Sequence, residues 1–136
     1  MARRKPAPCP CGGATLADCC GPLHDGARAA TDAAALMRSR YSAYALGLTD
    51  YLLATWHPDT RPATLALDPS MKWIGLAVED ARSQDPDHAT VRFTARYRAG
   101  GRAGRLHENS RFERIDGRWF YRDGDVDETP PAAGPR

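Results

Sequence analysis

Apolar residues recur every three or four positions from Leu36 to His57, which is the spacing of one face of an α-helix. The stripe comprises Leu36, Met37, Tyr41, Tyr44, Ala45, Leu48, Tyr51, Leu52, Thr55 and Trp56. Gly47 and the Thr49-Asp50 pair interrupt it, and Thr or Asp can cap a new helix. Pro58 ends the pattern because a proline pushes the preceding residue out of the helical region. The stretch therefore predicts two helices that need a sheet to cover.

The second half of the chain alternates between apolar and polar residues, as strands with one buried face do. Four strands are predicted, at 72–80, 89–98, 105–115 and 118–122. In the first, we expect Ile74, Leu76 and Val78 to share the inner face. Glycines at 100, 101 and 104 predict one turn, and Asp116-Gly117 predicts a two-residue hairpin. Helices followed by an antiparallel meander predict an α+β fold with the helices on one face of a curved sheet.

Charge changes sign along the second half of the chain. The chain of 136 residues is long enough for one domain, and its net charge is only +2. Nine arginines lie between His88 and Arg122, whereas acidic residues dominate beyond. One interpretation is weak RNA or DNA binding by outward arginines of the sheet, namely Arg92, Arg96, Arg98, Arg105 and Arg111. The other is an ordinary solvated surface.

Four cysteines lie in two close pairs, Cys9-Pro10-Cys11 and Cys19-Cys20. Zinc prefers four soft ligands in a tetrahedron, and two short pairs joined by a glycine-bearing turn can supply them. We therefore expect structural Zn²⁺ bound by Cys9, Cys11, Cys19 and Cys20. Disulfides, free thiols, or His24 in place of one cysteine are the alternatives. No stretch reaches the roughly 18 apolar residues of a membrane span, and the N-terminal residues lack the apolar core of a secretory signal, so a reducing cytoplasm without membrane contact is expected.

Several sequence blocks carry a resemblance to a known family. CPCGG…CCG is similar to the SEC-C zinc motif at the tail of the SecA translocation ATPase. LMRSRYSAY, DYLLATWHPDT and ENSRFERIDGRWFYRDGD resemble the YchJ family of uncharacterised bacterial proteins. The resemblance implies an NTF2-like (cystatin-like) middle domain and zinc bound by the four cysteines. The motif usually has eight residues between the second and third cysteines, whereas this chain has seven, and Ala14, Thr15 and Leu16 replace its usual lysines and aromatic.

These observations divide the chain into four segments. We expect a flexible basic arm at 1–8, a SEC-C-like zinc knuckle at 9–28, an NTF2-like domain at 29–126 and a disordered tail at 127–136.

The third predicted strand carries polar residues to the inner face. Its alternation places Glu108 and Ser110 with Leu106 and Phe112. A buried carboxylate is costly unless it is paired, and Arg40 or Arg38 on the covering helix is the expected partner. The candidate pocket comprises Arg40, Tyr41, Tyr44, Trp56, His57, Glu108, Ser110 and Tyr121. The simpler alternatives are a structural Arg–Glu bridge, tryptophans in the core and a histidine that ends a helix.

Three functions fit these features. The first is a zinc-binding, non-catalytic binding or adaptor module whose partner is a protein, an RNA or a second copy of the chain. The second is an enzyme or small-molecule binder that uses the pocket, with Glu108 as a general base. The third is the weak nucleic-acid association through the arginine-rich sheet.

Overall fold

The computed structural model describes residues 7–129, so most of the predicted arm lies outside the described residues, as does the tail from 130. The helices are α1 (Gly21–His24), α2 (Ala33–Leu46) and α3 (Thr49–Ala54). The strands are β1 (Met71–Asp85), β2 (His88–Ala99), β3 (Arg102–Ile115) and β4 (Arg118–Thr129). All neighbours pair antiparallel in the order β1-β2-β3-β4, so the predicted meander is confirmed.

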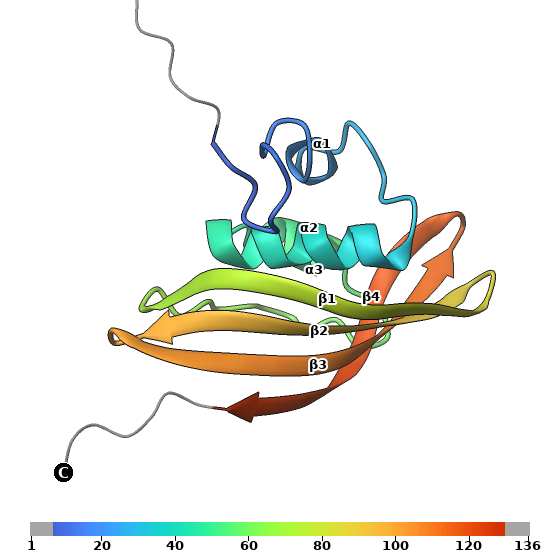
Figure 1. Ribbon diagram of the computed structural model, residues 1–136. Helices are drawn as coiled ribbons and strands as arrows, with labels where there is room; N and C mark the ends of the chain where they lie inside the picture. The colour runs from blue at the N-terminus through green and yellow to red at the C-terminus, as the bar shows by residue number, and fades with distance from the viewer. Residues whose placement is uncertain (1–6, 130–136) are drawn as a thin grey trace, which may run out of the picture.

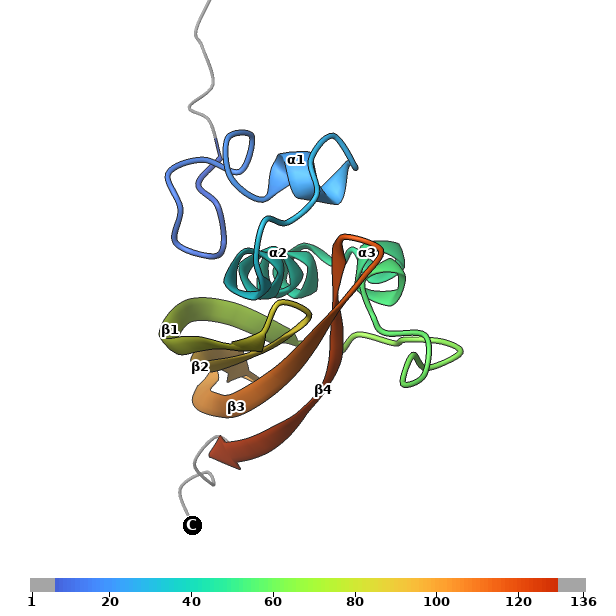
Figure 2. The same cartoon turned by 90° about the vertical axis from the view of Figure 1, so that its right-hand side faces the viewer.

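The protein is built in three layers (Figures 1 and 2). The curved sheet forms one layer, α2 and α3 lie on its concave face, and the cysteine segment with α1 lies on the far side of α2. The predicted α+β architecture is therefore confirmed. No helix within residues 7–129 is long and apolar enough to cross a membrane.

Helix α2 begins and ends where local chemistry requires it. The Asp32 carboxylate accepts a hydrogen bond from the backbone N–H of Ala35 at 2.7 Å, which caps the first turn. Gly47 ends the helix with φ of 76°, a left-handed conformation that glycine adopts without a steric penalty. The break predicted between the two helices is confirmed.

Strand β1 corrects one prediction about the inner face. Leu76 and Val78 pack against the core as expected, but Ile74 is 50% exposed and Trp73 packs inward instead. A β-bulge between Trp73 and Gly75 causes this reversal, because one extra residue shifts the alternation to the opposite face. A pattern of alternating residues does not reveal a bulge.

The last two strands are longer than predicted. Gly104 lies inside β3 rather than in the turn, and β4 continues to Thr129 rather than ending at Arg122. Residues 127–129 of the predicted disordered tail are therefore strand. The acidic end of β4 stays paired because Arg111 on β3 contacts Asp123 at 2.5 Å and Asp125 at 2.9 Å.

Helix α2 is buried on two sides, although the sequence predicted one apolar stripe. Met37 and Tyr41 are part of the core beneath the helix. Ser39 and Ser42, which have no exposed surface, are also buried. The cysteine segment covers the polar side of the helix, so serines that resemble surface residues are in fact enclosed.

Candidate metal centre and cavity

The four cysteine sulfurs form one compact cluster. Their Sγ atoms all lie within 4.8 Å of one another. The separations are 3.4 Å for Cys9–Cys11, 3.5 Å for Cys11–Cys19, 3.7 Å for Cys11–Cys20 and 3.9 Å for Cys19–Cys20. A tetrahedral Zn²⁺ with Zn–S bonds of about 2.3 Å would separate its sulfurs by about 3.8 Å. The four side chains are therefore placed as a tetrahedral metal site requires.

Two glycines shape the loop around these sulfurs. Gly12 adopts φ of 98°, which favours a residue without Cβ. At Gly13, a Cβ would lie 2.6 Å from the Cys19 sulfur, so a side chain would obstruct the cluster. The seven-residue loop thus closes because glycine occupies the two positions after Cys11.

The structure disfavours two alternatives to a four-cysteine metal site, namely disulfides and His24 as a ligand. None of the four cysteines forms a disulfide. His24 does not join the cluster, because its Nε2 atom lies 2.8 Å from the backbone oxygen of Ser39. The arrangement of the cluster therefore favours a set of four sulfur ligands.

The sulfurs cannot all carry negative charge unless a cation balances them. Burial opposes ionisation of the Cys9 thiol, but hydrogen bonds from Ser42 and neighbouring groups outweigh it and lower the pKa of Cys9 to about 6. Burial and the neighbouring sulfurs raise the pKa of Cys19 to about 11 and also raise the pKa of Cys20. One thiolate forms readily, whereas further deprotonation calls for a bound cation.

Helix α2 holds the cysteine cluster from below. The Ser42 hydroxyl lies 3.5 Å from the Cys9 sulfur and donates to the Cys20 sulfur at 3.3 Å. Arg38 on the same helix donates to the backbone oxygen of Cys11 at 3.5 Å. The sequence placed Arg38 as a partner for Glu108, but its side chain turns toward the cysteines. Ser42 was missed because a serine on the polar side of a helix gives no signal of burial.

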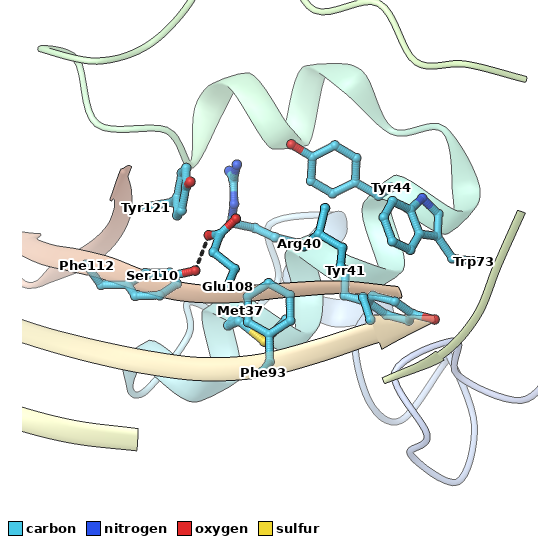
Figure 3. A pocket seen from close by; sticks show the side chains of 12 residues that line it. Met37, Arg40, Tyr41, Tyr44, Trp73, Phe93, Glu108, Ser110, Phe112 and Tyr121 are labelled. Carbon is cyan, nitrogen blue, oxygen red and sulfur yellow. Dashed lines mark hydrogen bonds between the residues drawn. The ribbon is translucent and has the colours of Figure 1, made fainter. Parts of the chain in front are cut away.

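A cavity of about 210 Å³ lies between α2 and the sheet. Figure 3 shows its lining, which is mostly aromatic and aliphatic. Of the candidate pocket residues, it is lined by Arg40, Tyr41, Tyr44, Glu108, Ser110 and Tyr121. The other lining residues come from the inner faces of α2 and the strands: Met37, Trp73, Phe93, Ala95, Leu106 and Phe112.

Glu108 is the one carboxylate in the cavity lining, and its partner differs from the predicted one. The residue is only 9% exposed. Ser110, which is on the same face of β3, donates a hydrogen bond to its carboxylate (Figure 3). No arginine or lysine within residues 7–129 forms an ion pair with Glu108, so the predicted Arg40–Glu108 bridge is wrong.

Arg40 instead joins α2 to the end of α3. Its Nη1 donates to the Leu52 backbone oxygen at 2.7 Å and to the Thr55 hydroxyl at 2.6 Å. Its guanidinium carbon lies 5.0 Å from the ring centre of Trp56 and 4.7 Å from that of Tyr121. Burial lowers the pKa of Arg40, and the nearby Tyr44, Tyr121, Tyr51 and Glu108 oppose this shift. Arg40 thus presents a fixed, partly desolvated cation near the carboxylate.

Trp56 and His57 do not line the cavity. The Trp56 ring contacts the Arg40 guanidinium and packs edge-on against Tyr121 at 5.2 Å. His57 is buried on another side, where its Nε2 lies 2.7 Å from a Glu113 carboxylate oxygen. Backbone contacts with β4 fix both residues outside the cavity. The His57 N–H donates to the Tyr121 backbone oxygen at 2.7 Å, and Trp56 forms a β-bridge with Tyr121.

Burial and a neighbouring carboxylate change the pKa values of the tyrosines in the cavity. Burial, followed by the charge of Glu108, raises the pKa of Tyr121. Burial also raises the pKa of Tyr44, although Arg40 opposes this effect. Both phenols are therefore protonated near neutral pH and present hydroxyl groups at the polar end of the cavity.

Comparison with known proteins identifies the family. Residues 32–124 match the family described as YchJ, middle NTF2-like domain. The chain belongs to the YchJ family. This YchJ-family chain is 52% identical to a UPF0225 protein of Methylibium petroleiphilum over 98% of this chain and 97% of the relative. It is 58% identical to a UPF0225 protein of Chromobacterium violaceum over 87% and 92% of the two chains.

Two solved structures share the fold of the YchJ-family chain. A solution structure of a SEC-C motif containing protein from Rhodopseudomonas palustris has a TM-score of 0.76 at 36% identity, covering 89% of this chain and 98% of that one. A crystal structure of a SEC-C motif containing protein from Psychrobacter arcticus has a TM-score of 0.70 at 28% identity, covering 90% and 75%. The predicted family and the predicted NTF2-like fold are both confirmed.

Proposed function

We propose that this chain is a zinc-binding NTF2-like protein that acts as a non-catalytic binding module, with its ligand in the cavity beneath α2. The observation that carries the proposal is the cavity itself, which is lined mainly by apolar groups and holds a buried carboxylate at one end. Ligand sites typically combine an apolar lining with a few polar groups that orient the ligand.

Size and chemistry narrow the ligand class. The cavity, about 210 Å³, is smaller than the roughly 300–1,000 Å³ of pockets for drug-sized molecules. Glu108 accepts a hydrogen bond from Ser110 and can accept another from a ligand hydroxyl or amine. A small apolar molecule with one hydrogen-bond donor therefore suits the cavity.

The polar groups in the lining support binding rather than catalysis. Arg40 uses Nη1 to hold the end of α3, and the Ser110 hydroxyl donates to Glu108. A serine nucleophile is commonly activated by a histidine base, and within residues 7–129 the lining of the cavity contains no histidine. His57, the histidine proposed for this site, lies against Glu113 and not in the cavity.

Binding of small probe molecules tests the cavity. Benzyl alcohol and toluene share an aromatic ring, but only benzyl alcohol carries a hydroxyl donor. We expect both to shift the NMR signals of Phe93 and Trp73, with benzyl alcohol binding more tightly. Glu108→Gln should remove most of that preference, whereas Glu79→Gln on the outer face should keep it. Equal affinities for the two probes, or no shifts in the cavity, would contradict the proposed site.

Zinc is the metal that the cysteine cluster supports best. Four sulfur ligands in a tetrahedron suit Zn²⁺, and they leave no open position for a catalytic water. When bound, the ion would balance the thiolate charge and cross-link the two cysteine pairs. X-ray absorption at the zinc edge should then report four sulfur neighbours at about 2.3 Å. A mixed nitrogen and sulfur shell would contradict the four-cysteine assignment.

A further inference from the structure

The arginines on the outer face of the sheet fall into two groups, those in ion pairs and those without. The predicted basic patch included Arg92 and Arg111, but Arg92 lies opposite Asp80 and Arg111 contacts two aspartates of β4. Arg82 is likewise paired, with Asp80 at 2.6 Å. Arg82 and Arg111 are therefore neutralised by ion pairs. Arg92 forms no ion pair among residues 7–129, although it faces Asp80, and the other arginines of the patch have no carboxylate directly opposite them.

Four cations meet at the other end of this face. We call Lys72, Arg96, Arg98 and Arg105 the basic hollow. Antiparallel pairing sets Arg96 directly opposite Arg105, and Lys72 directly opposite Arg98. All four are exposed, and none of them forms an ion pair with a carboxylate within residues 7–129. The side-chain contact found for Arg98 is a 3.5 Å hydrogen bond to the Gly101 backbone oxygen.

Two acidic residues of this face, Glu79 and Asp127, lie on the strands that carry or adjoin the hollow. Glu79 accepts a hydrogen bond from Thr94 at 2.8 Å and lies 3.2 Å from His107. Asp127 pairs in register with His107, two residues along from Arg105. Neither carboxylate forms an ion pair with the basic hollow among the described residues. Among residues 7–129, the positive charge of the hollow is therefore not neutralised by any ion pair.

The surface is also recessed at this point. A depression of about 420 Å³ is lined by Arg96, Arg98 and Arg105, with Thr129 and the half-exposed Ile74 beside them. The bulge in β1 turns Ile74 outward here, and the Arg96 side chain lies beside Gly75. The three guanidinium groups thus border a shared hollow.

Like charges directly opposite one another destabilise a sheet. An anion that bridges Arg96 and Arg105 would reverse this penalty, and guanidinium groups match phosphate oxygens in geometry. We propose that the basic hollow binds the phosphate backbone of a nucleic-acid duplex. Cations distributed over β1, β2 and β3 suit a row of phosphates. Within residues 7–129, the face offers no exposed phenylalanine, tyrosine or tryptophan ring on which the bases of a single strand could stack.

Fluorescence anisotropy with a labelled RNA duplex tests this site across a series of salt concentrations. We expect the wild-type protein to bind with an affinity that falls as salt rises. Arg96→Gln with Arg105→Gln should weaken binding and reduce the salt slope by about two, one for each lost phosphate contact. The matched control is Arg82→Gln with Arg111→Gln, which removes the same charge from paired positions of the same face. It should keep the salt slope of the wild type.

Several results would overturn the proposal. Equal loss in the two double variants would mean that net charge alone attracts the RNA. A single strand that binds as tightly as the duplex, or pyrophosphate that competes at equimolar concentration, would replace the duplex with another phosphate ligand.

Thermal unfolding checks that the double variant is folded. Removing two opposed charges should leave Arg96→Gln with Arg105→Gln at least as stable as the wild type.

Discussion

Ser42 links the cysteine cluster to the NTF2-like domain through a single hydroxyl group. Its side chain is fully buried and contacts the sulfurs of Cys9 and Cys20. Groups that hydrogen-bond to metal ligands fix their orientation and tune their basicity. At the scale of one residue, Ser42 is therefore a positioning residue for the proposed zinc site.

Replacing Ser42 tests that role. Ser42→Ala should lower zinc affinity by roughly 10- to 100-fold, because the two thiolates lose a hydrogen-bonding partner. Competition with a chromogenic zinc chelator measures this change. Ser39→Ala is the matched control, since the Ser39 hydroxyl contacts the Leu36 backbone oxygen and Tyr51 but no sulfur. An equal loss of affinity in both variants would show that burial, rather than the sulfur contact, matters.

His57 is a second buried polar residue whose role follows from its contacts. Its Nδ1 accepts a hydrogen bond from the Asp59 backbone N–H at 3.0 Å, so the proton resides on Nε2 and is donated to Glu113. Arg122 donates to the same Glu113 oxygen at 2.9 Å. The histidine therefore fixes the end of the α3 segment to the sheet.

Removal of the His57 side chain should cost stability rather than ligand binding. We expect His57→Ala to lower the free energy of unfolding by about 2 kcal/mol, because it breaks a buried hydrogen bond to a charged partner. Urea denaturation measures the change. His107→Ala, at a half-exposed histidine beside Glu79, should cost less than about 0.5 kcal/mol. A His57 variant as stable as this control would contradict the assigned role.

At the scale of an element, a missing side chain on β3 leaves space for a tyrosine ring from β2. A Cβ at Gly104 would lie 2.6 to 2.8 Å from atoms of the Tyr97 ring, which is buried against the sheet. The Tyr97 hydroxyl also donates to Glu128 on β4 at 2.9 Å, so the ring bridges three strands. Gly104 thus allows the ring to lie flat across the sheet.

Gly104→Ala should therefore destabilise the sheet. A rigid ring cannot yield easily, so we expect a loss of about 1–3 kcal/mol in the free energy of unfolding. Gly75→Ala is the control, because its Cβ would meet only the Arg96 side chain, at 3.8 Å. Chemical denaturation of both variants makes the comparison. Equal stabilities would refute the packing argument.

At the scale of the whole molecule, the cysteine segment and the NTF2-like domain share one core. Cys9, Cys11 and Cys20 belong to the same buried cluster as Leu36 and Met37. Metal binding and folding are coupled when the ligands form part of the fold. The proposed zinc site should therefore stabilise the helical layer as well as its own loop.

Metal removal tests this coupling. Thermal unfolding of the zinc-loaded protein should give one transition, detected equally by tryptophan fluorescence and by circular dichroism. A chelator should lower the midpoint of that transition for both signals, because each layer loses support. An NTF2-like domain that unfolds at an unchanged temperature in chelator would contradict the shared core.

Periodic patterns in the sequence predicted most of the architecture. Spacings of three to four residues predicted the helices, and alternation of apolar and polar residues predicted the four strands. The same alternation placed Glu108 and Ser110 on the inner face. What the sequence missed depends on three-dimensional context. The bulge beside Ile74 and the covering of Ser42 by a distant loop leave no trace in local alternation. The predicted Arg40–Glu108 ion pair was wrong for the same reason, because Ser110 donates to Glu108 and Arg40 to the end of α3.

Metal content of the purified protein tests the central claim most directly. Elemental analysis of protein prepared without added zinc should give one zinc per chain, held by Cys9, Cys11, Cys19 and Cys20. Cys19→Ser should lose that zinc, whereas Ser39→Ala should retain it. A wild-type protein that contains no metal and has four reduced, reactive thiols would contradict the account.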